Sequence, residues 1–386
     1  QAGIRPLMPP HAPCGNPVDL TFSMDMAVMT DTIADLVMKS GEVDGVVLHG
    51  AMSTGFMKAI FPNISYLLPG MTLEDLLAQT DRDLSATARK PFENGIPMTV
   101  SSFFDRDDAY TLAYEDGEVP VLDAPEKAAR AMGTLVRYKR IRDRTPYAHP
   151  QEMDPDPVAG RIIDGALKNG QSALDEYHAK KLLACYGIPV PDERTANDLD
   201  SAVAAAADIG FPVVLKACDP DIAHKSDQQL VHLNITSADD AARAYQQIQQ
   251  SVGRTIPVLV SRMINGGREI LAGITWDEQF GHCVAFGVGG VLTEAINDIT
   301  YRMAPLCQRD AQEMLTEIKS TKLLGHYRGM PPVDANQLSG LLVRLSQIPL
   351  LHPHIREIDI NPLILSGSAP VAVDALVVLT QTRLRK

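Results

Sequence analysis

The stretch VVLKACDPDIAHKSD, residues 213–227, carries a lysine and a histidine eight positions apart. Lys216 ends an apolar run that is typical of a buried strand, and Pro220 breaks that run. An ammonium group can hold phosphate oxygens. The neutral imidazole of His224, with an ordinary pKa of about 6.5, can accept a phosphoryl group. The stretch therefore indicates phosphate chemistry. A surface lysine with a partly covered stem and an exposed loop histidine are the alternatives.

Oxygen ligands suited to a metal ion occur near the C-terminus. Asp359 and Asn361 alternate in EIDINPLIL, so their side chains share one face of a strand. Asp374 is central in VAVDALVVL, where a carboxylate among apolar neighbours is costly unless it is paired or binds a cation. Amide and carboxylate oxygens on adjacent strands suit Mg²⁺, which completes its shell with phosphate and water. We therefore predict a magnesium site at Asn361 and Asp374. An aspartate that faces solvent at a strand end is the alternative.

The elements of residues 1–145 alternate between strand and helix. Strand-like runs end at Gly50 and span 95–104 and 119–122, with helical patterns between them. This order predicts a parallel sheet with helices on its faces. DAPE at 123–126 predicts a capping box at the start of a helix. We expect that helix to bury Met132, Leu135 and Val136.

A hydrophilic, proline-bearing segment follows, and we assign 146–169 as a linker. The second domain, 170–386, opens with a helix that Asp175 caps and Gly187 ends. Its residues at i, i+3, i+4 and i+7 spacing are Ala179, Leu182, Leu183 and Tyr186. Later segments predict strands, and a leucine pattern over 338–345 predicts one more helix.

Composition limits the classes of function. The chain has 386 residues, of which 45% are hydrophobic and 22% charged, values of a globular protein with two or three domains. Its net charge of −13 argues against nucleic acid or an anionic membrane surface as a partner. No apolar run approaches the roughly 18 residues that span a bilayer. The five cysteines are dispersed and lack metal-type spacing, so we expect reduced thiols and a cytoplasmic location.

Six segments, in this order and spacing, give a specific resemblance. They are GNPVDLT, PVLDAPEKAARAMGTLVRY, DEYHAKKLLACYGIPVP, GFPVVLKACDPDIAHKSD, FGVGGVLTEAINDITYRMAPL and EIDINPL. The chain resembles the nucleoside-diphosphate-forming acyl-CoA synthetases, relatives of succinyl-CoA synthetase and of ADP-forming acetate–CoA ligase. The resemblance implies an α/β protein with a flavodoxin-like CoA-ligase domain over 1–145 and an ATP-grasp domain over 170–386. We expect the first domain to be incomplete at its N-terminus.

The resemblance also implies roles for individual residues. Lys216 matches a lysine that contacts nucleotide phosphates, and His224 matches a histidine that carries the phosphoryl group. Asn361 and Asp374 match ligands of Mg²⁺. The other nucleotide-binding positions that it implies are the hinge residues Ser261, Arg262 and Met263, then Glu269 at the mouth of the site and Arg302 in a segment that faces the phosphates.

The activity implied by the resemblance is formation of an acyl-CoA from a small carboxylic acid and CoA, with ATP converted to ADP and phosphate. The reaction of this family passes through phosphohistidine and acyl-phosphate intermediates. The CoA-binding and phosphohistidine domains would lie upstream or on another chain, and we expect an oligomer.

The sequence is also compatible with two other functions. The synthetase architecture also occurs as a regulatory, ligand-sensing part of protein acetyltransferases. Gln228 and Gln229 favour that alternative, because they occupy a stretch where the family has two glycines. An ATP-grasp carboxylate–amine ligase would share the nucleotide chemistry, but it has no use for the GNPVD segment.

Overall fold

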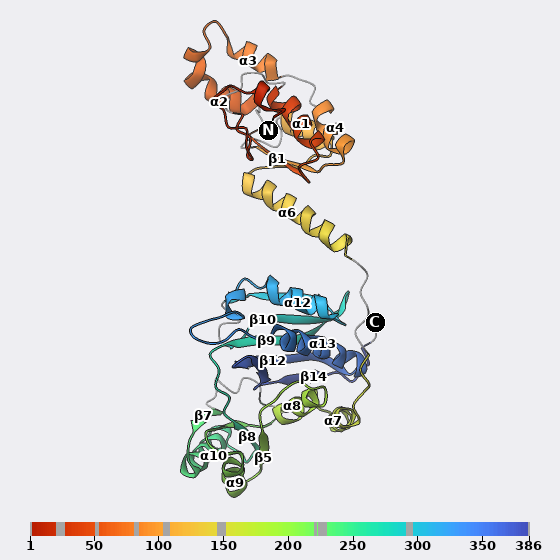
Figure 1. Cartoon of the computed structure of the whole chain (residues 1–386). Helices are drawn as coiled ribbons and strands as arrows, with labels where there is room; N and C mark the ends of the chain where they lie inside the picture. The colour runs from red at the N-terminus through yellow and green to blue at the C-terminus, as the bar shows by residue number, and fades with distance from the viewer. Residues whose placement is uncertain are drawn as a thin grey trace. The chain divides into compact units, whose positions relative to one another are not determined.

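The computed structural model describes residues 2–20, 28–50, 54–80, 85–102, 109–144, 152–219, 222, 230–290 and 296–384. The chain forms two compact units, Gln1–Pro146 and Tyr147–Lys386 (Figure 1). No helix in the described ranges combines the length and the apolar character needed to cross a membrane.

The first unit contains a parallel sheet in the order β1-β2-β3. Its strands are β1 (Val46–His49), β2 (Met98–Ser101) and β3 (Val121–Leu122). Its helices are α1 (Ile33–Lys39), α2 (Thr54–Ile64), α3 (Leu73–Thr80), α4 (Ser85–Asn94), α5 (Ala109–Asp116) and α6 (Pro125–Arg142), with short helical turns η1 (Arg5–Leu7), η2 (Val28–Thr32) and η3 (Ser65–Leu67). Every residue of the central strand β2 is buried. The parallel sheet with helical connections is therefore confirmed.

Two expectations for α6 are wrong. The helix is capped by Ala124 without a side-chain hydrogen bond, and Asp123 instead pairs with Lys127 at 2.8 Å. Leu135 and Val136 are exposed, at 45% and 39%. The reason is length: 18 helical residues extend about 27 Å, whereas a four-residue strand covers about 13 Å. The later turns of α6 therefore pass beyond the small sheet.

The second unit contains two antiparallel sheets. The larger has the order β11-β10-β9-β12-β14-β4, with β13 paired to β12, and the smaller has the order β5-β8-β6-β7. The larger sheet is built from β4 (Ala173–Leu174), β9 (Glu269–Asp277), β10 (Gly281–Val288), β11 (Ile299–Met303), β12 (Ile355–Ser366), β13 (Ala369–Ala372) and β14 (Leu376–Leu379). The smaller is built from β5 (Glu193–Ala196), β6 (Val213–Ala217), β7 (Val231–Ile235) and β8 (Val258–Arg262). The helices are α7 (Pro157–Lys168), α8 (Glu176–Cys185), α9 (Leu199–Ile209), α10 (Ala238–Val252), α12 (Gln308–Glu317), α13 (Ala335–Leu351) and the turn η6 (Thr321–Leu323).

Helices cover one face of each sheet. In the smaller sheet, Val213, Leu215 and Ala217 of β6 join the core formed with α9 and α10, so the intervening Lys216 lies on the opposite face. In the larger sheet, Ile358 and Ile360 join the core formed with α12 and α13. Asp359 lies between them and faces away from these helices.

Two sequence expectations for the helices of this unit are confirmed. Asp175 caps α8, where its side chain accepts the N–H of His178 at 2.9 Å. The apolar residues expected in the core are all buried, namely Ala179, Leu182, Leu183 and Tyr186 near α8 and Leu338, Leu341, Leu342 and Leu345 in α13.

The segment expected to be a linker contains a helix of the second unit. Asp156 caps α7 by accepting the N–H groups of Val158 and Ala159, and Pro157 occupies the first turn, where its missing N–H costs nothing. Ala159 and Ile163 are buried in the main core. The second unit therefore begins before residue 170, and the expected linker over 146–169 is shorter.

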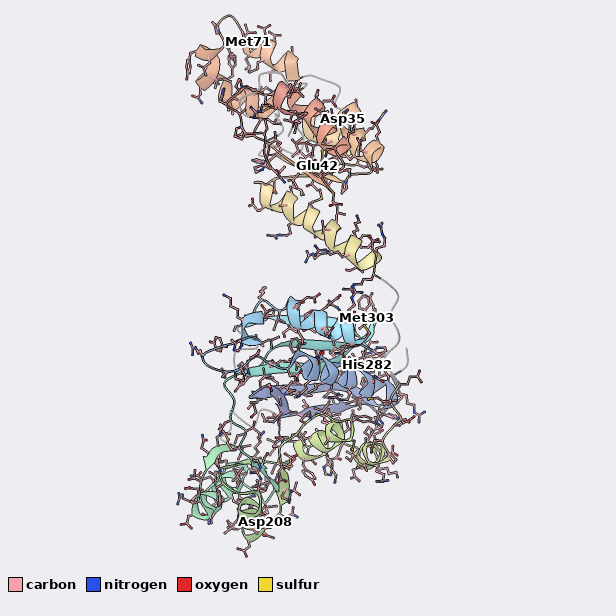
Figure 2. The ribbon with its side chains drawn as sticks, in the orientation of Figure 1. Asp35, Glu42, Met71, Asp208, His282 and Met303 are labelled. Carbon is pink, nitrogen blue, oxygen red and sulfur yellow. The ribbon has the colours of Figure 1, made fainter. Side chains whose placement is uncertain are left out.

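Buried histidines predict a loss of stability in acid. His282, in β10 (Figure 2), pairs through Nε2 with the Ile355 carbonyl at 2.9 Å, and His352 pairs with the Tyr186 hydroxyl. Burial lowers the pKa of both imidazoles below the ordinary value. The unfolded chain therefore binds more protons below about pH 6.5, and folding stability falls as pH drops through that window.

We expect urea denaturation to show a lower free energy of unfolding of the second unit at about pH 5.5 than at about pH 7.5, with each histidine contributing up to ~1.4 kcal/mol per pH unit. A His352→Gln variant should lose less stability over this interval than the unsubstituted protein. An equal loss in both proteins would assign the effect to other groups.

Candidate functional site

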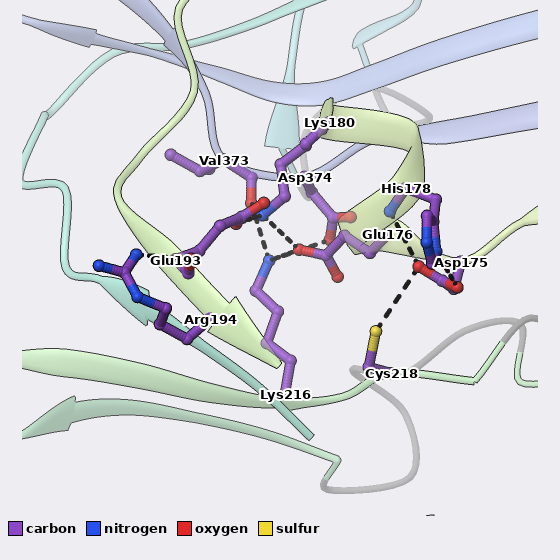
Figure 3. A network of polar contacts seen from close by, with 10 residues as sticks. All are labelled: Asp175, Glu176, His178, Lys180, Glu193, Arg194, Lys216, Cys218, Val373 and Asp374. Atoms are coloured by element: carbon purple, nitrogen blue, oxygen red, sulfur yellow. Dashed lines mark hydrogen bonds and ion pairs between the residues drawn. The ribbon is translucent and has the colours of Figure 1, made fainter. Parts of the chain in front are cut away.

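Lys216 lies in a buried polar cluster between the two sheets of the second unit (Figure 3). Its ammonium donates to Glu176 Oε1 at 2.7 Å and to the Val373 carbonyl at 2.8 Å. Asp374 Oδ2 lies 3.5 Å away. Burial acts to lower the pKa of Lys216, but the carboxylates of Glu176 and Asp374 outweigh it and raise the pKa above its ordinary value. The interpretation as a surface lysine is therefore wrong, and the side chain is a buried cation.

A second buried lysine belongs to the same cluster. Lys180, one turn after Glu176 on α8, lies 2.6 Å from Glu193 Oε2, 3.0 Å from Glu176 Oε1 and 3.4 Å from the Val373 carbonyl. Burial raises the pKa of Glu193, while Lys180 opposes that change. Glu176, Lys180 and Glu193 were not among the residues predicted from the sequence. The available signal was the i, i+4 spacing of opposite charges on a helix whose neighbouring residues are apolar.

Asp374 lies in the bend between β13 and β14, and not inside a continuous strand as expected from the sequence. Its side chain is 40% exposed, so it remains accessible to a ligand. Asp359 belongs to the same acidic region. Desolvation by surrounding protein raises the pKa of Asp359, and the carboxylates of Asp374 and Glu357 raise it further. Asp359 is nevertheless exposed at its surface. Carboxylates that repel one another at an accessible position are suited to a cation.

Asn361 is tied to a glycine turn. Its Oδ1 accepts the N–H of Gly290 at 2.7 Å. Gly290 has φ +69°, and a Cβ there would lie 1.7 Å from Glu269 Oε2, so a side chain at this position would collide with Glu269. The turn at 289–290 therefore holds Asn361 and Glu269 close together. Both residues were predicted from the sequence to belong to the site.

Asn361 and Asp374 are brought to neighbouring positions by the backbone. The N–H of Val373 donates to the carbonyl of Pro362 at 3.3 Å, so the residues next to both predicted ligands are hydrogen-bonded. The described residues contain no group of three or more histidine, cysteine, aspartate or glutamate side chains arranged to hold a metal ion. The oxygens present fit Mg²⁺, because this ion takes few protein ligands and keeps positions for phosphate and water.

The predicted hinge lies where the chain leaves the smaller sheet. Ser261 is buried and lies opposite Val214 of β6, on the face that also carries Lys216. Arg262 ends β8 and is exposed, and the N–H of Met263 donates to the Pro212 carbonyl at 3.1 Å. The chain then enters the larger sheet at Glu269. These residues connect the two sheets, as a hinge requires.

Arg302 does not join this group. It lies opposite Val284 in the β10–β11 pair, and Val284 belongs to the core beneath the helices. The guanidinium forms an ion pair with Glu317 at the end of α12. Strand alternation therefore places Arg302 on the helix-covered face, whereas Asp359 lies on the other face. The expectation that Arg302 faces the phosphates is not supported by this position.

His224 lies outside the described residues, but both ends of its segment are described. The N–H of Ala217 donates to the Leu230 carbonyl at 3.0 Å, and Lys216 lies opposite Val231 in the β6–β7 pair. Asp219, just after β6, is tied to Arg254 at 2.7 Å. The segment that carries His224 therefore leaves and returns beside Lys216.

A family model of the ATP-grasp domain matches residues 165–379. The β subunit of ADP-forming acetate–CoA ligase II from Pyrococcus furiosus is 38% identical over 228 residues, which are 57% of this chain and 97% of that subunit. The ADP-forming 4-hydroxybutyrate–CoA ligase of Nitrosopumilus maritimus is 29% identical over 370 residues, 94% of this chain and 49% of that protein. The chain thus spans about half of this longer relative.

Solved structures agree with these sequence matches. The dinucleotide forming acetyl-coenzyme A synthetase 1 of Candidatus Korarchaeum cryptofilum, in complex with coenzyme A and Ca-AMPCP, aligns with a TM-score of 0.56 and 37% identity, and covers 57% of this chain and all of that one. A second structure of that synthetase, with coenzyme A and Mg-AMPPCP, aligns with a TM-score of 0.52. Its description places the phosphohistidine segment of that protein toward its nucleotide binding site.

Proposed function

This chain belongs to the family of ADP-forming acyl-CoA ligases with an ATP-grasp domain, and we propose that it binds Mg-ATP between the two sheets of its second unit and transfers phosphate toward acyl-CoA synthesis. One observation carries the assignment to this site. Lys216 is a buried cation held 3.5 Å from the accessible carboxylate of Asp374. A fixed ammonium next to an accessible carboxylate is an arrangement that suits a metal–triphosphate complex.

The chain's own residues would act by positioning and charge neutralisation. Lys216 would donate to phosphate oxygens, and Ser261 to Met263 would line the adenine end. Asp374 and Asn361 would hold Mg²⁺, which neutralises charge on the phosphates when bound. Arg302 is not part of this set, because its guanidinium is paired with Glu317.

In the complete reaction, His224 Nε2 or Nδ1 would form a bond to the γ-phosphorus as the bond to the leaving ADP oxygen breaks. The phosphoryl group would next pass to a carboxylate oxygen, and attack by the CoA thiol on the acyl phosphate would release inorganic phosphate. We propose that domains outside these residues bind CoA, which is supported by the designation of one relative as a β subunit and by the greater length of another. The acid in these relatives is named as acetate or 4-hydroxybutyrate.

Calorimetric titration with ATP, in the presence and absence of Mg²⁺, tests the site. An Asp374→Ala variant should bind Mg-ATP more weakly by roughly 1–3 kcal/mol, the magnitude expected on removal of a charge-assisted partner. Its affinity for metal-free ATP should change less, because the lost carboxylate acts on the cation. Unchanged Mg-ATP affinity in this variant would contradict the site.

A panel of carboxylic acids then tests the reaction class. With CoA and the CoA-binding partner present, an acyl-CoA ligase releases ADP and forms a thioester. A carboxylate–amine ligase releases ADP only with an amine. A ligand sensor binds nucleotide without turnover. Thioester formation that depends on ATP would support the proposal over both alternatives.

A further inference from the structure

Glu176 is placed to act on the nucleotide site without touching a nucleotide. It is the first residue of α8, is 2% exposed, and accepts both Lys216 at 2.7 Å and Lys180 at 3.0 Å on the same oxygen (Figure 3). A carboxylate in the first turn of a helix is also favoured by the helix dipole. This location ties α8 to β6 of the smaller sheet.

The distances to the surrounding oxygens distinguish the two lysines. An ammonium group has three N–H donors. Lys180 has three oxygens within reach, from Glu193, Glu176 and the Val373 carbonyl, at 2.6, 3.0 and 3.4 Å. Lys216 has two close acceptors, Glu176 and the same carbonyl, at 2.7 and 2.8 Å. It also forms a longer ion pair with Asp374 Oδ2, at 3.5 Å. Two of the three N–H donors of Lys216 are therefore used by Glu176 and the Val373 carbonyl, and its third contact, with the half-exposed Asp374, is longer than any of the three contacts of Lys180.

We propose that Glu176 is a positioning residue, which fixes two donors of Lys216 together with the Val373 carbonyl and so directs the third donor toward the phosphates of the nucleotide. The proposal rests on the function proposed above. Val373 immediately precedes Asp374, so the same cluster also sets the place of the bend that carries the predicted metal ligand.

Removal of the negative charge of Glu176 is expected to lower the affinity for Mg-ATP. If its charge is removed, the ammonium of Lys216 loses its closest counter-ion, and the nearest carboxylate that remains is Asp374. A closer pair between Lys216 and Asp374 would withhold the cation from the phosphates and the carboxylate from Mg²⁺. We therefore expect weaker binding of Mg-ATP, although Glu176 itself lies behind the site.

A double-mutant cycle tests this role, with calorimetry of Mg-ATP as the measurement. Glu176→Gln should weaken binding about tenfold in the otherwise unsubstituted protein. In a Lys216→Met background, the same change should alter affinity less than about twofold, because the group that it positions is absent. Adenosine, which lacks phosphates, should bind all folded variants alike.

The matched control is Glu193→Gln. Glu193 is also buried and pairs with Lys180 at 2.6 Å, so its substitution disturbs the same cluster from the other side. We expect its Mg-ATP affinity to remain within about threefold of the unsubstituted protein. Three results would show that Glu176 has only a structural role. These are equal losses of affinity in both glutamine variants, an effect of Glu176→Gln that persists in the Lys216→Met background, or a parallel loss of adenosine binding.

The two methionine and glutamine variants distinguish an error in the positioning role from an error in the nucleotide site. If Lys216→Met binds Mg-ATP normally, the nucleotide site itself is wrong. If Lys216→Met binds weakly while Glu176→Gln binds normally, only the positioning role is wrong. Circular dichroism verifies folding. Should Glu176→Gln not fold, Glu176→Asp, which withdraws the carboxylate by one methylene, replaces it in the cycle with the same expected pattern and the same contradicting results.

Discussion

Replacing Lys216 by methionine is expected to weaken Mg-ATP binding by about 3 kcal/mol, or more than about 100-fold, the upper end for a hydrogen bond to a charged group. The substitution keeps most of the apolar stem and removes only the ammonium. That ammonium is held by Glu176 and the Val373 carbonyl, so it is ordered before a nucleotide arrives. Because the ammonium is already ordered, a contact with it contributes more binding free energy than a contact with a mobile surface lysine. Calorimetric titration measures the loss.

The chain offers a matched control for this variant in Lys180→Met. Lys180 is also buried, at 0% exposed against 7% for Lys216, and shares Glu176 with it, but its acceptors all lie inside the cluster. Both methionine variants should lose folding stability in thermal melts, because each leaves a buried carboxylate less well paired. Only Lys216→Met should lose the large part of its Mg-ATP affinity. A similar loss in both variants would show that the cluster maintains the fold and does not hold phosphate.

The sequence predicted most elements of the second unit because local patterns agreed with tertiary packing. Asp175 marked the start of α8, and the leucines of α13 faced the core as their spacing required. The errors have physical causes. The later apolar residues of α6 lie beyond the sheet. The prolines and charges before α7 are typical of a linker, although Pro157 occupies the first turn of an amphipathic helix.

The candidate site was only partly accessible from sequence. The sequence predicted Lys216 and Asp374 as site residues, and the structure brings them within 3.5 Å of each other. Glu176 was not predicted because it is 40 positions from Lys216. No local sequence pattern indicates which buried carboxylate will form an ion pair with a lysine on another element. The resemblance supplied the segment of Arg302 but not the strand register, and that register puts the side chain opposite Val284 on the helix-covered face.

His224→Ala is expected to abolish phosphoryl transfer from ATP to the protein, which is the largest effect that we predict. The chemical basis is the neutral imidazole, which is nucleophilic near neutral pH and can form a bond to phosphorus as ADP leaves. The geometric basis lies in the described ends of its segment. Ala217 and Leu230 are hydrogen-bonded at 3.0 Å, so the segment begins and ends beside Lys216.

The length of the segment that carries His224 allows the imidazole to approach a nucleotide bound at Lys216. His224 lies six residues before Leu230, the nearer end of its segment, which at about 3.3 Å per residue permits a displacement of up to roughly 20 Å from that end. With γ-labelled ATP and Mg²⁺, the unsubstituted chain should take up label that His224→Ala cannot. The label must be sought at neutral or alkaline pH, since phosphohistidine is acid-labile. Lys216→Met should also take up much less label, because it binds nucleotide more weakly, whereas His224→Ala should still bind Mg-ATP. If His224→Ala took up label as the unsubstituted chain does, the histidine would be an exposed loop residue and the acceptor would lie elsewhere.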